Sequence, residues 1–113
     1  MGLRKERLAD EIRDLLATAF MGGNMRDPRL EYVTITAVKL TPDLQLASVY
    51  YRVFGDATVV SSTQLGLDSA VGFLRRRLAE SLEIRRVPNL RFFHDESIER
   101  GSRIEHLLSQ IHD

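Results

Sequence analysis

The feature that most constrains the fold is a run of apolar residues at helical spacing in the second half of the chain. Its members lie three or four positions apart, and only one of them is polar: Val60, Gln64, Leu67, Val71, Leu74, Leu78 and Leu82. This spacing predicts a long helix with one face against a core. Gly66 and Gly72 interrupt it, and each glycine costs a helix about 1 kcal/mol relative to alanine. A kinked helix, or two helices that meet near Ala70–Gly72, satisfies both signals.

Two other segments have helical periodicity. The segment Leu3–Phe20 has apolar residues at the same spacing, and the glycines at 22 and 23 form a stop signal directly after it. Its apolar positions are Leu8, Ile12, Leu15, Leu16 and Ala19. Near the other end of the chain, Ser102–Glu105 has the capping-box form and Ile104–Ile111 is amphipathic. We therefore expect a first helix and a short last helix.

The segments Glu31–Leu40 and Leu44–Phe54 are rich in β-branched and aromatic residues, which favour strands. A turn-like link, Asp27–Leu30, leads into the first, and the turn signal Thr41–Asp43 separates the two, so we expect an antiparallel hairpin. Strict alternation puts Val33, Ile35 and Ala37 on one face of the first strand, and Thr34, Thr36 and Val38 on the other. It puts Ala47, Val49, Tyr51 and Val53 on one face of the second strand, and Ser48, Tyr50 and Arg52 on the other. A third strand is expected at Val87–His94, where Leu90 and Phe92 alternate with Arg91 and Phe93.

The expected order is helix, strand, strand, kinked helix, strand and short helix. It predicts one α+β domain over residues 1–113, with the helices on one face of a three-stranded sheet. A chain of 113 residues can bury a single core, and 43% hydrophobic with 28% charged residues is ordinary for a folded protein. It has no cysteine, no apolar run near the roughly 18 residues of a membrane span, and no apolar signal segment at its start. We expect a cytoplasmic protein, with a monomer as the default.

Positive charge is concentrated in one stretch of a chain whose net charge is zero. Residues 72–91 contain six arginines and two glutamates, a local charge of +4. In one interpretation Arg75, Arg76 and Arg77 simply lie on the solvent side of the helix, where three consecutive positions spread over about 200°. In the other, the small residues Ala70–Gly72 let a phosphate backbone approach closely, and the arginines on either side neutralise it.

Catalytic patterns are scarce. The chain has no nucleotide-binding fingerprint and no serine-nucleophile motif. His94 stands beside Asp95 and Glu96, but adjacent strand residues point to opposite faces, so we do not expect the three to share a metal ion or an acid–base role. His106 and His112 lie six positions apart, which is not the spacing of a metal-binding pair on a helix. We expect no enzyme, no metal and no cofactor; a small enzyme that uses His94 and Asp95 is an alternative.

Several motifs, in this order, resemble the bacterial ribosome-binding factor A family. They are Arg4-Lys5-Glu6-Arg7, Asp27-Pro28-Arg29-Leu30, Val33-Thr34-Ile35-Thr36-Ala37-Val38, Thr41-Pro42-Asp43-Leu44, Ala47-Ser48-Val49-Tyr50, Ala70-Val71-Gly72-Phe73-Leu74-Arg75, Arg86-Val87-Pro88-Asn89-Leu90 with Phe92, Asp95 and Ser97, and Gly101-Ser102-Arg103-Ile104. Each is weak alone, whereas their order and spacing together are specific. They cover nearly the whole chain.

The resemblance implies a type II KH-like fold, in which an Ala-x-Gly kink between two helices replaces the Gly-x-x-Gly loop that clamps a nucleic-acid backbone. Ala70-Val71-Gly72 matches that kink. It also implies a function: binding to free small (30S) ribosomal subunits, late assembly and maturation of the 5′ end of 16S rRNA, often in cold adaptation. Members are frequently more basic than this neutral chain.

We predict that the rRNA-contacting surface consists of the kink and the basic residues around it and at the start of the chain. These residues are Lys5, Arg7, Ala70, Val71, Gly72, Arg75, Arg76, Arg77, Arg85 and Arg86. The expected partners are 16S rRNA and the free 30S subunit, without a membrane or a small-molecule substrate. The alternative is a protein-interaction or regulatory α+β module whose arginines are only solvated.

Overall fold

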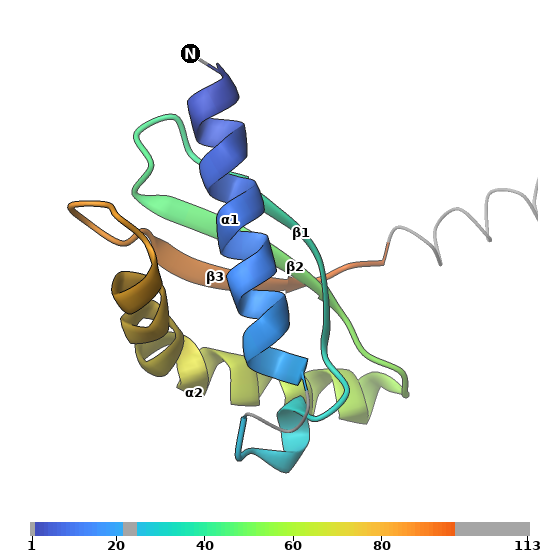
Figure 1. Ribbon diagram of the computed structural model, residues 1–113. Coiled ribbons are helices and arrows are strands. Elements are labelled where there is room, and N and C mark those ends of the chain that lie inside the picture. Colours follow the sequence, from blue (N-terminus) through green and yellow to red (C-terminus); the bar gives the residue numbers. More distant parts are fainter. Residues whose placement is uncertain (1, 22–24, 97–113) are drawn as a thin grey trace, which may run out of the picture.

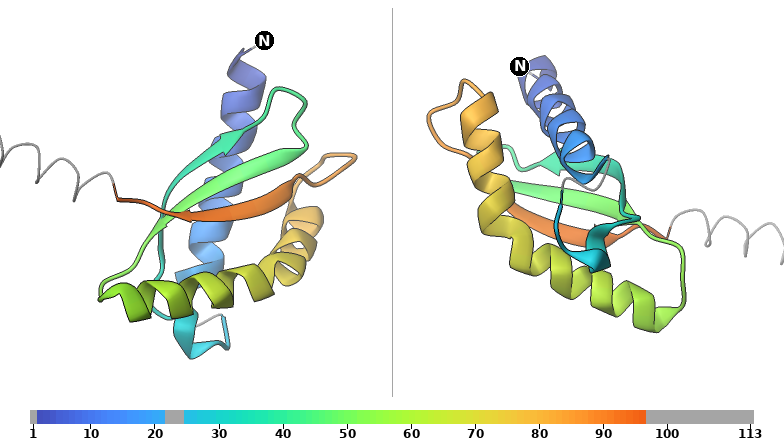
Figure 2. Two further views of the ribbon diagram at one scale, coloured as in Figure 1. Left: turned by 180° about the vertical axis from the view of Figure 1, so that it is seen from behind. Right: turned by 60° about the horizontal axis from the view of Figure 1, so that its bottom comes forward.

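The computed structural model describes residues 2–21 and 25–96 and has one layer of helices on one layer of strands (Figure 1). The elements in chain order are α1 (Gly2–Phe20), the 3₁₀ helix η2 (Pro28–Leu30), β1 (Thr34–Leu40), β2 (Leu46–Arg52), α2 (Ala57–Ser81) and β3 (Asn89–His94). The strands form a sheet in the order β1-β2-β3, in which β1 and β2 are antiparallel and β2 and β3 are parallel. Both helices lie on the same face of the sheet (Figure 2). The predicted α+β class with a three-stranded sheet is confirmed.

Helix α1 forms where the periodicity predicted it. Its apolar stripe, Ala9, Ile12, Leu16, Ala19 and Phe20, is buried in the core, with Leu8 and Leu15 partly buried beside it. The helix ends at Phe20. The glycine stop signal at positions 22 and 23 lies outside the described residues, as do the capping box and the predicted last helix.

The hairpin forms, but β1 departs from strict alternation. The pairing register shifts between Ile35 and Ala37, which is the signature of a β-bulge. The bulge reverses the orientation of the residues after it, so Ile35 and Val38 pack against the core and Ala37 does not. The predicted faces of β1 are therefore wrong beyond Thr36. In β2 the prediction is confirmed, because Ala47, Val49, Tyr51 and Val53 are all buried.

Strand β3 alternates as predicted. Leu90 and Phe92 are buried, whereas Arg91 and Phe93 are exposed. The proline that precedes it, Pro88, is buried and lies just outside the strand, where its missing N–H costs the sheet no hydrogen bond.

Helix α2 is one uninterrupted helix of 25 residues. The prediction of two separate helices that meet at Ala70–Gly72 is therefore wrong. The other prediction, a single bent helix, agrees with Figure 2, where the axis of α2 changes direction in the yellow part of the ribbon, near residue 70 on the colour bar. The apolar stripe faces the core throughout: Leu67 and Leu74 have no exposed surface, Leu78 and Leu82 are buried, and Val60 and Val71 are partly buried. A bend that follows the curvature of the sheet keeps the stripe buried over its whole length.

The polar member of the stripe, Gln64, joins α2 to two strands. The buried Tyr51 hydroxyl donates to Gln64 Oε1 at 2.7 Å, and Gln64 Nε2 donates to the Phe92 carbonyl at 2.9 Å and to Asp68 Oδ1 at 3.0 Å. Burial raises the pKa of Tyr51, and the Asp68 carboxylate adds to this effect, so the hydroxyl keeps its proton. Gln64 therefore satisfies a buried hydroxyl and a carbonyl that an apolar residue would leave unpaired.

Gly66 lets η2 approach α2 closely. A Cβ at this position would lie 3.0 Å from Leu30 Cδ2 and 3.3 Å from Arg29 Cβ. The neighbouring Thr63 hydroxyl donates to the Arg29 carbonyl at 3.3 Å, which ties the same two segments together. Gly66 is thus a packing residue, whereas a Cβ at Gly72, the other glycine of the run, would make only an ordinary contact with Arg76 Nη1 at 3.8 Å. No helix in residues 2–21 or 25–96 is both long and apolar enough to cross a membrane.

The two glycines predict opposite effects of an alanine substitution. Gly66→Ala pushes a methyl group against the buried Leu30, and overpacking of this kind costs about 1–3 kcal/mol. Gly72→Ala meets only Arg76 Nη1, at 3.8 Å, and should stabilise the helix by up to about 1 kcal/mol. Urea denaturation of the two variants beside the unaltered protein measures the difference. Equal stabilities would contradict the close packing of η2 on α2.

Candidate nucleic-acid interface

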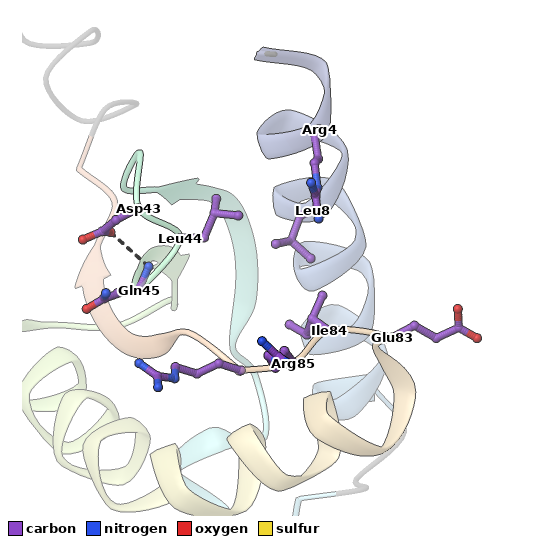
Figure 3. A pocket seen from close by; sticks show the side chains of 9 residues that line it. Arg4, Leu8, Asp43, Leu44, Gln45, Glu83, Ile84 and Arg85 are labelled. Carbon is purple, nitrogen blue, oxygen red and sulfur yellow. Dashed lines mark hydrogen bonds between the residues drawn. The ribbon is translucent and has the colours of Figure 1, made fainter.

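Arg85 and Arg86 of the predicted surface meet Arg4 of α1 beside a hollow of about 320 Å³ (Figure 3). Its walls come from α1, from the β1–β2 turn and from the loop between α2 and β3. The lining residues are Arg4, Leu8, Asp43, Leu44, Gln45, Glu83, Ile84, Arg85 and Arg86. Leu8, Leu44 and Ile84 are partly buried against the core and give the hollow an apolar base.

A second hollow of about 440 Å³ continues the first along α1. It shares Arg4, Leu8, Leu44, Glu83 and Ile84 with the first and adds Arg7, Glu11 and Ser81. We call the two hollows together the α1–α2 groove, because they run between the start of α1 and the end of α2. The groove contains Arg7, Arg85 and Arg86 of the predicted surface, and also Arg4. Lys5 is half-buried and does not line it.

The arginines of the groove are available to an external anion. In the described part of the chain, no carboxylate oxygen forms an ion pair with Arg4, Arg7, Arg85 or Arg86. Three acidic residues, Asp43, Glu11 and Glu83, also line the groove, so its excess of positive charge is small. The Asp43 carboxylate accepts hydrogen bonds from the Thr41 hydroxyl (2.7 Å) and the Gln45 amide (3.1 Å), which hold its pKa below the usual range and fix it in the turn.

The three consecutive arginines of α2 have different surroundings. Arg76 and Arg77 are exposed. Arg75 is half-buried, and its guanidinium donates to the Val87 carbonyl at 3.0 Å and the Pro88 carbonyl at 3.2 Å. The interpretation that all three lie on the solvent side is therefore wrong for Arg75, which fastens the loop between α2 and β3 to the helix. The same loop carries Arg85 and Arg86 to the groove.

Sequence reasoning missed Phe73 as part of this side of the molecule. The Arg77 guanidinium lies 5.9 Å from the centre of the Phe73 ring, and 41% of Phe73 is exposed. Phe73 also lines a separate hollow of about 330 Å³ with Met25, Arg26 and Asp27. Its position four residues before Arg77, off the buried stripe of α2, is a signal in the sequence that points to an exposed pair.

The three residues of the predicted kink differ in their exposure to solvent. Ala70 and Val71 are partly buried against the core, so most of their surface packs inside the protein. Gly72 is exposed, and the nearest atom to a Cβ placed there is the side-chain nitrogen Nη1 of Arg76. Of the three kink residues, Gly72 gives a ligand the closest access to the backbone, with a guanidinium beside it.

His94 and Asp95 have different neighbours in the structure. The His94 ring centre lies 5.6 Å from that of Tyr51, and its Nδ1 is 3.8 Å from Glu96 Oε1. Asp95 instead accepts a 2.6 Å hydrogen bond from the Thr36 hydroxyl. Within the described ranges, no cluster of three or more His, Asp or Glu residues could hold a metal ion. His106 and His112 lie outside those ranges.

Comparison with protein families finds one that spans most of the chain. The family model described as Ribosome-binding factor A matches residues 4–108. Among curated relatives, Ribosome-binding factor A of Geobacter sulfurreducens is 44% identical over 108 residues, which are 96% of this chain and 91% of the relative. The protein of the same name from Anaeromyxobacter sp. strain K is 44% identical over 95% of this chain and 78% of the relative.

Solved structures agree with the sequence comparison. The crystal structure of ribosome-binding factor A from Thermus thermophilus superimposes with a TM-score of 0.73 at 29% identity, covering 82% of this chain and 97% of that one. The solution structure of a putative ribosome binding factor A from Thermotoga maritima gives 0.74 at 36% identity, covering 88% and 93%. A Thermus thermophilus homology model fitted into a cryo-electron microscopy map of a 30S complex gives 0.65 at 28% identity, covering 78% and 91%.

The position of Arg75 predicts a structural effect that its neighbour does not share. Arg75→Met removes charge-assisted hydrogen bonds to two carbonyls and should lower the free energy of unfolding by about 1–2 kcal/mol. Arg76→Met, at an exposed position one residue further, should change it by less than about 0.5 kcal/mol. Thermal and urea denaturation of both variants checks this. Equal stability of the Arg75→Met and Arg76→Met variants would show that Arg75 does not hold the loop.

Proposed function

The chain belongs to the ribosome-binding factor A family, and on this premise we propose that it is a non-enzymatic assembly factor that binds free small ribosomal subunits in the cytoplasm. The observation that carries the proposal is the arrangement of exposed arginines along one side of the molecule. Arg76 stands beside the exposed Gly72, and Arg4, Arg7, Arg85 and Arg86 line the α1–α2 groove. None of these arginines has a carboxylate partner among the described residues. Arginines without internal partners suit the phosphates of rRNA.

The proposed contacts fall on the helical side of the protein. We assign the phosphate contacts to Arg4, Arg7, Arg76, Arg85 and Arg86. Arg77 and Phe73 together offer a cation beside an exposed ring, which suits an unpaired base. Lys5, Ala70 and Val71 border this surface, Gly72 gives the backbone access, and Arg75 positions the loop that carries Arg85 and Arg86.

Two finer assignments accompany the proposal. We propose a type II KH-like arrangement, in one domain and as a monomer, in which the bend of α2 stands where other KH domains have the Gly-x-x-Gly loop. The continuous α2 and the exposed Gly72 are compatible with it. We also propose that binding to the small subunit supports its late assembly and the maturation of the 5′ end of 16S rRNA. Cells would need this activity most during growth in the cold. The 30S complex into which a similar structure was fitted supports a small-subunit partner.

The alternative, a protein-interaction or regulatory module with solvated arginines, differs in its behaviour on a sucrose gradient. A factor for small-subunit assembly sediments with free small subunits and is absent from fully assembled ribosomes. A module of the other kind remains near the top of the gradient in either preparation.

Reversal of two arginine charges should weaken small-subunit binding. In Arg76→Glu/Arg86→Glu, two phosphate contacts are lost, so affinity should fall at low salt and the slope of log affinity against log salt should decrease by about 2. Filter binding of purified small subunits over a salt series measures both quantities.

Arg13→Glu is the matched control. Arg13 is also exposed on α1, 3.7 Å from Asp14, but lies outside the proposed surface. The reversal there introduces the same change of charge per residue and should leave the salt slope unchanged. If affinity falls by the same amount per reversed residue in the double variant and in the control, the assignment of phosphate contacts to Arg76 and Arg86 is wrong.

A further inference from the structure

The face of the sheet opposite the helices has an arrangement that the proposed function does not use. Figure 2, left, shows the sheet from the side that neither α1 nor α2 covers. Because Ala47, Val49, Leu90 and Phe92 point into the core, their neighbours along β2 and β3 point to this open face. The strand register arranges these neighbours in rows that run across the sheet.

The central row is aromatic. Ala37 pairs with Tyr50, and Tyr50 pairs with Phe93. The two ring centres are 5.6 Å apart with an angle of 31° between the ring planes, and 41% of Phe93 is exposed. Aromatic residues on an open sheet face are not needed for the core, since the opposite face already contains the buried side chains.

The rows on either side of the aromatic one contain cations. One row consists of Lys39, Ser48 and Arg91, and on the far side Arg52 pairs with Thr34. Lys39 Nζ lies 5.5 Å from the centre of the Tyr50 ring, which places the charge directly beside the aromatic row. Arg52 Nε is buried and has no hydrogen-bond acceptor among the described residues.

Negative charge is absent from the strands themselves. The segments Thr34–Leu40, Leu46–Arg52 and Asn89–His94 contain no aspartate and no glutamate, and their lysine and arginines all point to the open face. Asp95, whose backbone N–H donates to the Tyr51 carbonyl at 2.7 Å directly after β3, brings a carboxylate to the edge of this face, where it accepts the hydrogen bond of the Thr36 hydroxyl. The open face therefore has an excess of positive charge around an aromatic centre, with the Asp95 carboxylate at one edge.

We propose that this open face binds single-stranded RNA, with one base stacked on Phe93 and the flanking phosphates on Lys39, Arg91 and Arg52. Successive rows of a sheet face are about 6.6–6.8 Å apart, so a base on the aromatic row keeps its own phosphates within reach of the cations on both sides. Stacking on aromatic side chains beside a basic groove is the general chemistry of single-strand binding. We choose RNA over a protein partner because of Lys39, since lysine is depleted at protein interfaces, whereas the aromatic rings and the arginines suit either partner.

This surface lies opposite the α1–α2 groove and shares no residue with it. It extends the proposed function by a second RNA contact, so that the protein would hold RNA from two sides. The two proposals can fail separately, since one concerns RNA bound on the helical side of the protein and the other concerns RNA bound on the open face of the sheet.

The test uses a ten-nucleotide uridine RNA, which forms no secondary structure, and the full chain labelled with ¹³C in its aromatic rings. We expect the ring signals of Phe93 and Tyr50 to move upfield on titration, because a stacked base shields them. Phe93→Ala should weaken binding, measured by fluorescence anisotropy, by about tenfold, as expected for the loss of one stacked base. Lys39→Ala/Arg91→Ala should decrease the salt slope by about 1.4, since single strands give about 0.7 for each phosphate.

Phe54→Ala is the control, because Phe54 is an exposed ring (87%) that lies after β2, beside η2 and the start of α2, and outside both proposed surfaces. It should leave the binding of this RNA unchanged. If Phe73→Ala weakens binding and Phe93→Ala does not, the single strand binds the helical side and the proposal is overturned. Unmoved ring signals of Phe93 and Tyr50 overturn it as well, whatever the stability of the Phe93→Ala variant.

Two further outcomes separate the proposals. Loss of small-subunit binding in Phe93→Ala together with unchanged affinity for the free RNA would show that the face recognises a protein, against our inference. Failure of Arg76→Glu/Arg86→Glu to weaken small-subunit binding would contradict the groove, whereas upfield shifts of the Phe93 ring in that same variant would still support the open face.

Discussion

Burial of one stripe of α2 against the sheet is the constraint on which the other features depend. Leu67 and Leu74 have no exposed surface, and Gln64 is bound to Tyr51 and to the Phe92 carbonyl. These contacts fix the rotation of the helix about its axis, and every other side chain of α2 then has a determined direction. Arg75 reaches the loop before β3, Arg76 stands beside Gly72, and Arg77 lies by Phe73. The distribution of positive charge is thus a consequence of how the core packs.

The same layer of contacts divides the molecule into two chemically different sides. Toward the helices, the sheet presents apolar side chains to the core, and the arginines of α1 and of the α2–β3 loop gather at the rim of that core. Away from the helices, β2 and β3 present alternating cations and aromatic rings. A sheet with helices on one face leaves its second face exposed to solvent. Because side chains alternate along a strand, every second residue points to that face, away from the core. Both sides suit a nucleic-acid partner, because each combines cations for phosphates with an exposed ring for an unpaired base.

Predictions from the sequence succeeded where the signal was local and repeated. The stripe of α2, the stripe of α1 and the alternation of β2 and β3 are periodic over many residues, so one irregular position does not hide them. The predictions failed where a single residue departs from the regular period or is bound by a distant part of the chain. The bulge at Thr36 reverses the faces of β1 beyond it, yet threonine there is ordinary for a strand. The solvent position expected for Arg75 failed because its acceptors, the Val87 and Pro88 carbonyls, come from residues 12 and 13 positions later.

Within the described residues, the sequence alone determined α1, α2 and the three strands, their order, which face of each helix is apolar, and that positive charge is concentrated around residues 72–91. Motif order also indicated the family before any fold was known. Only the tertiary structure decided that Arg4 and Arg7 face Arg85 and Arg86 across one groove, that Ala70 and Val71 belong mostly to the core, and that Tyr50 and Phe93 stand side by side. The physical reason is one of distance along the chain. Periodicity is set by backbone geometry within a few residues, whereas a binding surface forms from segments that meet only when the core between them closes.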